Sequence, residues 1–434
     1  MTLLVTVVAA VGFFALIMAS IALHEIGHLL PAKLFGVKVT QYFVGFGRTL
    51  WRTRRGDTDY GIKAIPLGGY VRMVGMYPPA SAPQGAPASQ STPGALQRLA
   101  DEARAYEYET ITPADDGRLF HQKPVWQKVI VMAGGPLMNL LLAFAIFAAI
   151  NGLHGQYRAQ LVVAQVSECV VPAARESRAC TDADPLSPAQ AAGVRAGDRI
   201  VSFNGVDLHS WEQLSELIRA NGSSSARLVV ERDGRRVPLP AVDTIVTGVR
   251  DQLDPARTVE AGFLGVTPTT ERVRGGLGVT AQDMWLQTKQ SVTALSRFPV
   301  KVWNVATDLV TGQQRDQNGP ISIIGASRVA GEIAGTPELT RADKIASWFA
   351  MLGSVNLFVC LLNCVPLPPL DGGHIVGALY EGFRRGLARL LGRPDPGHVD
   401  TARMLPIAYG VGAFLALAGA VLIIADLFSP VKVF

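Results

Sequence analysis

The sequence predicts a polytopic α-helical membrane protein with about four transmembrane helices, a cytoplasmic membrane-associated β-hairpin region and an extracytoplasmic α+β domain. Of its 434 residues, 49% are hydrophobic and 17% are charged, whereas a typical soluble domain carries roughly 25% charged residues. The mean hydropathy is +0.25, and the apolar residues are gathered into four blocks. This composition excludes a disordered chain, a coiled coil and a collagen, and argues against a purely soluble enzyme.

The four apolar blocks predict the membrane spans. The first, Leu3–Leu23, contains 21 uncharged residues, enough for a helix of about 30 Å that crosses a bilayer. No Lys or Arg precedes Lys33, so we interpret this block as a retained span and not as a signal peptide. The other blocks run from about Val129 to Ile150, from about Trp348 to Val365 and from about Leu405 to Leu427.

Basic residues predict the orientation of these spans. Lys and Arg are frequent in residues 29–128 and 371–404 and absent from the N-terminal tail. Because cytoplasmic loops carry an excess of Lys and Arg, we expect both termini to be extracytoplasmic and the segment between the second and third spans to face outside. The net charge of +5 comes from residues spread along the chain, so we expect no nucleic-acid partner.

The segments between the spans differ in character. Residues 77–96 are rich in Pro, Ala, Ser and Gln and predict a disordered cytoplasmic insert. Before them, Asp59–Ile65 and Gly69–Met73 flank a Pro-Leu-Gly-Gly turn, which predicts a hairpin. In the external segment, a strand near Leu161–Val166 and a helix near Trp211–Ala220 predict an α+β domain.

The four cysteines are too few for a disulfide scaffold. Cys169 and Cys180 lie in the external segment, where they either close a short disulfide loop in an oxidising space or remain free thiols. Cys360 and Cys364 lie in the third span, and we interpret them as packing residues.

The most specific motif is His24-Glu25-Ile26-Gly27-His28, at the end of the first apolar block. Side chains four residues apart lie on the same face of a helix. His24 and His28 can therefore bind one Zn²⁺, and Glu25 lies near enough to take a proton from a metal-bound water. The alternative is a pair of histidines at a membrane interface without a function. Polar groups at the edge of a span are energetically costly, however, which argues against this alternative.

A catalytic zinc site needs a third protein ligand and one open position. The third apolar block breaks at Pro366, Pro368 and Pro369, and Asp371 follows them. Irregular backbone at membrane depth is tolerated only where it lines a buried or wet cavity, and a carboxylate there needs a cation. We therefore select Asp371 as the third ligand; the alternative is an aspartate that only caps a cytoplasmic helix.

These motifs resemble those of the site-2 protease family of intramembrane zinc metalloproteases. The match comprises HEIGH at 24–28, PLGGYVRM at 66–73, AGGPLMN at 133–139 and NCVPLPPLDGG at 363–373, with a PDZ-like insertion between the second and third spans. It covers most of the chain outside residues 77–96. The layout is similar to that of the bacterial subgroup that cleaves anti-sigma factors in envelope signalling.

The resemblance implies that His24, His28 and Asp371 hold Zn²⁺ and that Glu25 is the general base of peptide hydrolysis. It implies a multi-pass protein of the bacterial inner or plasma membrane, with its active site on the cytoplasmic side. The implied partners are the lipid bilayer, a single-pass membrane substrate of the anti-sigma-factor type, and an upstream site-1-type protease. The PDZ-like domain would limit access by substrates that have not been shortened first.

The predicted parts follow in chain order: span 1 with the HExxH motif at 1–30, the cytoplasmic membrane-associated β region at 31–76, a disordered cytoplasmic insert at 77–118, span 2 at 129–151, the PDZ-like domain at 158–270, an extracytoplasmic helical region at 271–347, span 3 with the LDG motif at 348–374, a cytoplasmic loop at 375–404 and span 4 at 405–428. Two stretches depart from the family. We expect the first helix to kink or end at Pro31, and Ser167–Asp184 to form an extra loop.

Several further residues are candidates for substrate contacts. Asn139 and Asn363 are polar residues at membrane depth that either bind substrate backbone or the developing oxyanion, or hold helices together. We expect His374 to lie outside the ligand set, because a fourth ligand would close the site. The edge of the hairpin at 59–73 suits strand addition by an unwound substrate.

The external part contains two more candidates. Gly262, Phe263, Leu264 and Gly265 resemble the carboxylate-binding loop of PDZ domains, or form an ordinary strand flanked by glycines. Met284–Trp303 combines aromatic and basic residues suited to an amphipathic helix on the outer membrane face, although we favour a packing helix.

Two other functions fit parts of the sequence. A membrane metal transporter would use a His/Asp site between spans, but its polar residues would be distributed along several spans, whereas here they cluster at one depth. A catalytically inactive scaffold would bind partners through its PDZ-like domain, but it would lack the general base, whereas Glu25 is present.

Overall fold

The computed structural model describes residues 2–78, 102, 105, 111–171, 179–251, 258–316 and 319–431. The chain divides into two compact units. One comprises Met1–Ala148 and Asp283–Phe434 and contains the long apolar helices; the other, Ala149–Gln282, contains most of the β-structure.

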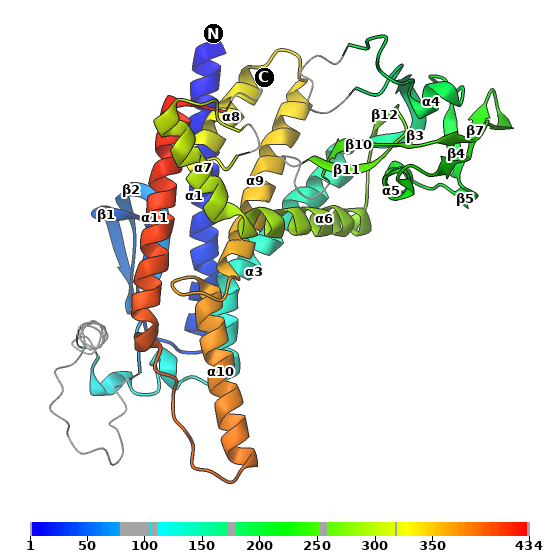
Figure 1. Ribbon diagram of the computed structural model, residues 1–434. Coiled ribbons are helices and arrows are strands. Elements are labelled where there is room, and N and C mark those ends of the chain that lie inside the picture. The colour runs from blue at the N-terminus through cyan, green and yellow to red at the C-terminus, as the bar shows by residue number, and fades with distance from the viewer. Residues whose placement is uncertain are drawn as a thin grey trace. The chain divides into compact units, whose positions relative to one another are not determined.

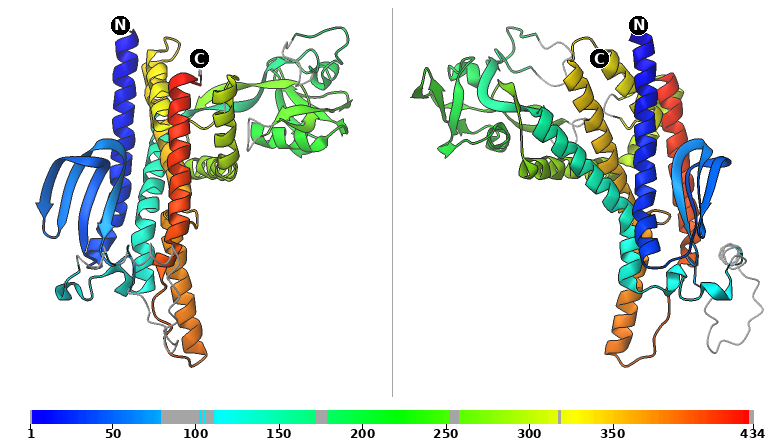
Figure 2. Two further views of the ribbon diagram at one scale, coloured as in Figure 1. Left: turned by 60° about the vertical axis from the view of Figure 1, so that its left-hand side comes forward. Right: turned by 180° about the vertical axis from the view of Figure 1, so that it is seen from behind.

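Among the described residues, four helices are long and apolar enough to cross a membrane, which confirms the predicted number of spans. They are α1 (Thr2–Leu34), α3 (Val125–Ala149), α9 (Arg341–Asn363) and α11 (Leu405–Phe428). They run alongside one another in Figure 1. The two ends of the chain lie at the same end of this helical unit (Figure 2), as an even number of crossings requires.

Glycine allows α1 and α3 to touch. A Cβ atom built at Gly134 on α3 would lie 2.0 Å from the carbonyl oxygen of Gly27 on α1, and one built at Gly27 would lie 2.3 Å from the carbonyl oxygen of Gly134. Any side chain at either position would force the helices apart. Small residues serve this purpose where membrane helices pack closely, and here the contact holds the HEIGH motif against α3.

The sequence predicts that the first helix kinks or ends at Pro31. The helix continues to Leu34, so an end at this proline is wrong. Proline lacks an N–H group and leaves the carbonyl four residues earlier, that of Gly27, without its helical partner. This carbonyl faces Gly134, and a Cβ at Gly134 would lie 3.3 Å from Cγ of Pro31. Packing against α3 therefore stabilises the helix on both sides of the proline.

The third span ends where its prolines predict, but it begins at Arg341 and not at 348. Thr340 caps its first turn and accepts a hydrogen bond from the backbone N–H of Asp343, as N-cap residues do. After Asn363 the chain is irregular, and α10 (Asp371–Leu390) begins as a separate helix. The loop predicted over 375–404 is therefore wrong for residues 375–390, which belong to α10; this helix continues beyond the end of α9 in Figure 1.

The β region after α1 consists of β1 (Val39–Arg55) and β2 (Thr58–Met73). The expected hairpin between 59–65 and 69–73 is wrong, because both segments pair with β1 and not with each other. Residues 41–44 pair with 59–62 on one side and with 69–72 on the other. Residues 69–73 therefore form an edge of this sheet, which lies beside α1 in Figure 2.

The helical region before the third span contains α6 (Leu277–Ser296), α7 (Phe298–Thr311) and α8 (Ile323–Gly335). The single helix expected over Met284–Trp303 is wrong, because a new helix begins at Phe298 with proline in its first turn. Buried Asp426, the one charge in the fourth block, pairs with Arg315 at 2.6 Å and accepts the N–H of Ser322 at 2.6 Å. A carboxylate at this depth is thus neutralised.

The second unit is an α+β domain. Its main sheet has the order β12-β3-β4-β7-β8, with β5 beside β4, and two short pairs, β6-β9 and β10-β11, accompany it. The bounds are β3 (Gln156–Val166), α4 (Pro188–Ala191), β4 (Arg199–Phe203), β5 (Val206–Asp207), α5 (Trp211–Asn221), β6 (Ser225–Ala226), β7 (Leu228–Arg232), β8 (Arg235–Pro238), β9 (Val242–Asp243), β10 (Ile245–Arg250), β11 (Thr258–Phe263) and β12 (Val266–Val273).

The core of this unit packs the apolar face of α5, through Leu214 and Ile218, against Ile200 and Phe203 of β4. The strand predicted near Leu161–Val166 is part of β3, and the helix predicted near Trp211–Ala220 is α5. Of the two alternatives for the external cysteines, the structure has the disulfide between Cys169 and Cys180. Part of the predicted extra loop, residues 172–178, lies outside the described residues.

The predicted insert at 77–118 falls largely on residues 79–101, 103–104 and 106–110, which lie outside the described part of the chain. For residues 111–118 the predicted disorder is wrong, because Pro113–Asp115 forms a short 3₁₀ helix. A second one, Phe120–Gln122, follows the insert. Asp115 is buried and accepts a hydrogen bond from Nζ of Lys38 at 2.8 Å. This hydrogen bond is the main cause that lowers the pKa of Asp115 to about 2.

We expect Gly27→Ala to destabilise the helical unit, because overpacking of a tight contact typically costs about 1–3 kcal/mol. The unfolding midpoint of the purified protein in detergent should fall by several degrees. Gly12→Ala, on the same helix where a Cβ meets nothing within 4 Å, is the matched control. Equal midpoints for both variants would contradict the close contact with α3.

We expect Asp115→Asn to destabilise the fold at neutral pH by about 1–2 kcal/mol, since a charge-assisted hydrogen bond is lost. The carboxyl has a lower pKa in the folded protein than its usual 3.8, so its contribution is present above about pH 4 and is lost as the pH falls toward 2. Unfolding midpoints between pH 7 and pH 3 test this: the difference from wild type should shrink on acidification. Asp116→Asn, one residue away and exposed, should show no such trend.

Candidate active site

Two separate helices bring the predicted metal-binding residues together. The HEIGH motif lies in the last turns of α1, and Asp371 is the first residue of α10. The Nε2 atoms of His24 and His28 are 3.3 Å apart. Oδ2 of Asp371 lies 3.5 Å from Nε2 of His24 and 3.3 Å from Nε2 of His28. The three donor atoms thus form a nearly equilateral triangle.

This triangle fits a tetrahedral zinc ion. Bonds of about 2.0–2.1 Å in tetrahedral geometry place the ligand atoms about 3.3–3.4 Å apart. Nδ1 of His28 donates to the carbonyl of Val131 at 2.8 Å, which leaves the lone pair of Nε2 directed at the triangle. Oδ2 of Asp371 has no hydrogen-bond partner among the described residues. Two imidazoles and one carboxylate are the donor set of catalytic zinc sites that keep a fourth position open.

Glycines shape the space around the donor atoms. A Cβ at Gly135 of α3 would lie 2.2 Å from Nε2 of His28, so only glycine leaves room for the imidazoles. Gly372 and Gly373 follow Asp371, and a Cβ at these positions would lie 2.3 Å from the carbonyl oxygen of Val365 and 2.5 Å from the backbone nitrogen of Pro368. The irregular segment can therefore fold back onto the first turn of α10, which directs Asp371 toward α1.

Glu25 lies in the same cavity, between α1 and the sheet edge. Its Cγ atom would be 3.1 Å from a Cβ at Gly69, and its carboxylate interacts with the backbone of Val71. The cavity has a volume of about 480 Å³. Three residues of the HEIGH motif, His24, Glu25 and His28, form part of its wall. Other lining residues include Ser20, Gly68–Val71, Met73, Asn139, Asn356, Asn363, Asp371 and His374.

The other predicted site residues divide between the two units. Asn139 is 1% exposed, and its Oδ1 has no partner in the part of the chain that is described; Asn363 is the last residue of α9. Both line the cavity, as does His374, one turn after Asp371. The predicted carboxylate-binding loop lies in the second unit. Gly262 and Phe263 end β11, and Leu264, which is buried, and Gly265 connect it to β12. Its role stays a prediction.

Sequence reasoning missed Ser20 and Asn356, which also line the cavity. The available signal was a polar residue inside each of two apolar blocks, but such residues often only join helices. It also counted Lys128 as no more than a basic residue near a span end. In the structure Lys128 is 4% exposed and pairs with Glu381, 253 residues later in the chain.

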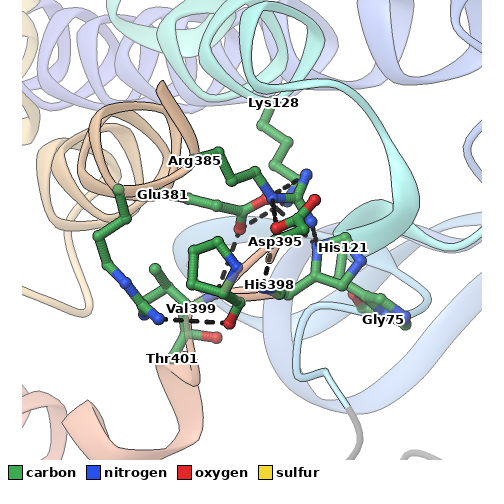
Figure 3. A network of polar contacts seen from close by, with 12 residues as sticks. Gly75, His121, Lys128, Glu381, Arg385, Asp395, His398, Val399 and Thr401 are labelled. Atoms are coloured by element: carbon green, nitrogen blue, oxygen red, sulfur yellow. Dashed lines mark hydrogen bonds and ion pairs between the residues drawn. The ribbon is translucent and has the colours of Figure 1, made fainter. Parts of the chain in front are cut away.

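This ion pair joins α3 to α10 near the candidate site. Nζ of Lys128 lies 2.9 Å from both carboxylate oxygens of Glu381. Figure 3 shows further groups on the same carboxylate: Nη1 of Arg385 at 3.3 Å, Nδ1 of His398 at 3.2 Å and the backbone N–H of Val399 at 3.3 Å. Lys128 precedes Val131, which holds His28, by one helical turn, so the pair fixes α3 where it supports the predicted metal-binding residues.

The network stays close to electrically balanced at neutral pH. Burial by itself would raise the pKa of Glu381, but Lys128 brings it below its usual value. Burial lowers the pKa of His398 and that of His121, whose ring lies 5.2 Å from the ring of His398. Both histidines are therefore uncharged at neutral pH. The two carboxylates, Glu381 and Asp395, then balance Lys128 and Arg385, and Asp395 lies 3.3 Å from Nε of Arg385.

A helical membrane protein with this donor set and a glutamate beside it has the features of a membrane metalloprotease. Comparison with known proteins agrees. The sequence model of Peptidase family M50 matches residues 12–390. The zinc metalloprotease Rip1 of Mycobacterium tuberculosis is 31% identical over 439 residues, which cover 98% of this chain and 99% of Rip1.

More distant relatives carry similar names. Rip1 of Mycolicibacterium smegmatis is 30% identical over 452 residues, covering 98% of this chain and 99% of the relative. The metalloprotease MmpA of Caulobacter vibrioides is 29% identical over 403 residues, covering 86% and 89%. The chain therefore belongs to Peptidase family M50, the site-2 protease family, and is a zinc-dependent metalloprotease.

We expect Lys128→Met to lower both stability and zinc retention, because removal of one partner leaves the other charge buried and typically costs about 3–5 kcal/mol. Unfolding midpoint and zinc per protein chain, measured in detergent, check this. The double variant Lys128→Met/Glu381→Gln should recover part of both. Lys123→Met, at a half-buried position five residues earlier where Nζ bonds the carbonyl of Gly117, is the control and should change both far less.

Proposed function

We propose that this protein hydrolyses a peptide bond within or near the transmembrane segment of a single-span membrane protein. The observation that carries the proposal is the convergence of His24, His28 and Asp371 beside Glu25, in a cavity lined by apolar helices. The substrate is a pre-cleaved protein of the anti-sigma-factor type, and the pathway is regulated intramembrane proteolysis in envelope stress signalling. This narrower assignment rests on the resemblance of the motifs to that subgroup.

In this proposal His24, His28 and Asp371 hold the zinc ion, which when bound polarises the scissile carbonyl and acidifies a water molecule. Glu25 accepts the proton of the attacking water and delivers it to the leaving nitrogen, as a general acid–base residue does. Its place between the two histidines and the sheet edge at Gly69 supports this role.

The substrate must be unwound before attack, because a helical carbonyl is already hydrogen-bonded and shielded. The β2 edge, residues 69–73, lines the cavity and offers backbone groups for strand addition. Asn139 and Asn363 line the same cavity and are proposed to bind the substrate backbone or the developing oxyanion through their amides.

The orientation is proposed from the distribution of Lys and Arg: both termini extracytoplasmic in a bacterial inner membrane, with the active site toward the cytoplasmic side. The second unit is then an extracytoplasmic PDZ-like domain that restricts entry to substrates shortened by an upstream site-1-type protease. The disulfide Cys169–Cys180 supports an oxidising location for this unit.

We expect Glu25→Gln to reduce cleavage by at least about 100-fold, since loss of a general base commonly costs that much, while zinc content stays at the wild-type level. Trimming of a co-expressed single-span reporter and zinc per chain are the measurements. Glu212→Gln, on the exposed side of α5, should cleave normally. Trimming by Glu25→Gln at the wild-type rate would overturn the proposed function.

His24→Ala separates metal binding from proton transfer. We expect this variant to lose both cleavage and zinc, because two protein ligands hold a catalytic zinc ion far less tightly than three. Metal analysis after dialysis against a weak chelator is the measurement. Stoichiometric zinc in His24→Ala would contradict the proposed ligand set.

A further inference from the structure

A buried amide lies on the wall of the cavity, on the opposite side from the sheet edge. Asn356 of α9 is 1% exposed and lines the cavity together with Ser20 of α1. Its Nδ2 donates to Oγ of Ser20 at 3.1 Å and to the carbonyl of Leu352 at 2.8 Å. Its Oδ1 has no hydrogen-bond partner among the residues that the structure describes.

The orientation of this amide is fixed by its neighbours. The Leu352 carbonyl can only accept, so rotating the amide by half a turn would place two acceptors against each other. An unpaired buried oxygen is unfavourable, and membrane lipid supplies no donor for it. Because Asn356 lines the cavity, a donor brought in by a bound peptide would satisfy this oxygen after a small shift of the side chain.

Asn356 and the sheet edge contact different sides of the helix α1. Ser20 meets α9, whereas Glu25 meets β2 at Gly69. Five residues on a helix are about 140° apart in projection, so the two contacts lie at opposite margins of the face of α1 that lines the cavity. A peptide that fills the cavity has the β2 edge on one side and Asn356 on the other.

An extended peptide needs partners on both sides, because its backbone N–H and C=O groups point alternately to opposite sides. The β2 edge can pair with one side only. The groups on the other side would be unpaired at membrane depth, which is costly. The unpaired acceptor on the opposite wall can bind one such backbone N–H. This contact does not depend on the side chains of the substrate.

We propose that Asn356 is a substrate-binding residue whose Oδ1 accepts a backbone N–H of the unwound peptide on the side away from β2. Ser20 is a positioning residue that orients the amide. The inference rests on the proposed function. Asn356 and Asn363 are about 10.5 Å apart along α9, which is about the length of three residues of extended chain. Both amides can therefore contact the same short segment of peptide.

The first test is cleavage of β-casein, a disordered protein that needs no unwinding, by the purified zinc-loaded full-length protein in detergent. Asn356→Leu should raise KM about tenfold, as expected for one lost hydrogen bond to a buried group, with kcat within about twofold and wild-type zinc content. Ser20→Ala should raise KM less. Ser354→Ala, on α9 but bonded to Gln287, is the control and should match wild type.

The second test identifies the backbone group itself. A synthetic peptide spanning a mapped casein cleavage site is made as a series in which each amide N–H is replaced by an ester oxygen. For the wild type, one ester position should raise KM about tenfold, and Asn356→Leu should show no rise there. If Asn356→Leu does not fold, Asn356→Ala replaces it.

Each failure has its own signature. Equal KM values for wild type and Asn356→Leu would overturn the role of Asn356. So would an ester series in which the two proteins show the same change in KM at every position. Retained cleavage of casein by Glu25→Gln in the same assay would overturn the proposed function instead. Loss of cleavage in Glu25→Gln together with an unchanged KM in Asn356→Leu would leave the protease mechanism in place and remove only this substrate contact.

Discussion

Two glycines, Gly27 on α1 and Gly134 on α3, let the backbones of the first two membrane helices touch, because a Cβ at either position would overlap a carbonyl oxygen of the other helix. The rest of the site depends on this approach. It places Gly135 beside the imidazole of His28 and brings the Val131 carbonyl within hydrogen-bond distance of the same ring. The ring is thereby held in one tautomer, with its second nitrogen available to a metal ion.

Two buried ion pairs in the helical unit join segments far apart in the chain. Lys128 and Glu381 join α3 to α10, and Asp426 holds the segment before α8 through Arg315. Such pairs contribute little net stability, because desolvation offsets the attraction. Their value here is positional, since an unpaired charge at these depths would be far more costly than a paired one. In the proposed function, Asp371 would follow the same rule with a metal ion as its partner.

The fold also explains how a helical protein can process an extended peptide. The β1–β2 sheet lies against α1 and presents an open edge to the cavity, while α9 presents amide side chains to it. A bundle of helices alone has no unpaired backbone to offer, because its N–H and C=O groups are bonded internally. The strand edge therefore supplies what the spans cannot, and the cavity between the strand edge and α9 suits a chain without secondary structure.

The sequence by itself determined the four spans, the two histidines on one helical face and the aspartate after the prolines, because apolar length, helical spacing and proline chemistry are local properties. Tertiary structure decided the rest. Pairing of β1 with both halves of β2 replaced the expected hairpin, and packing against Gly134 carried α1 through Pro31. Asn356 and Ser20 are 336 residues apart, and their contact exists only because α1 and α9 are neighbours. No local pattern encodes such a contact, since it depends on which helices pack together.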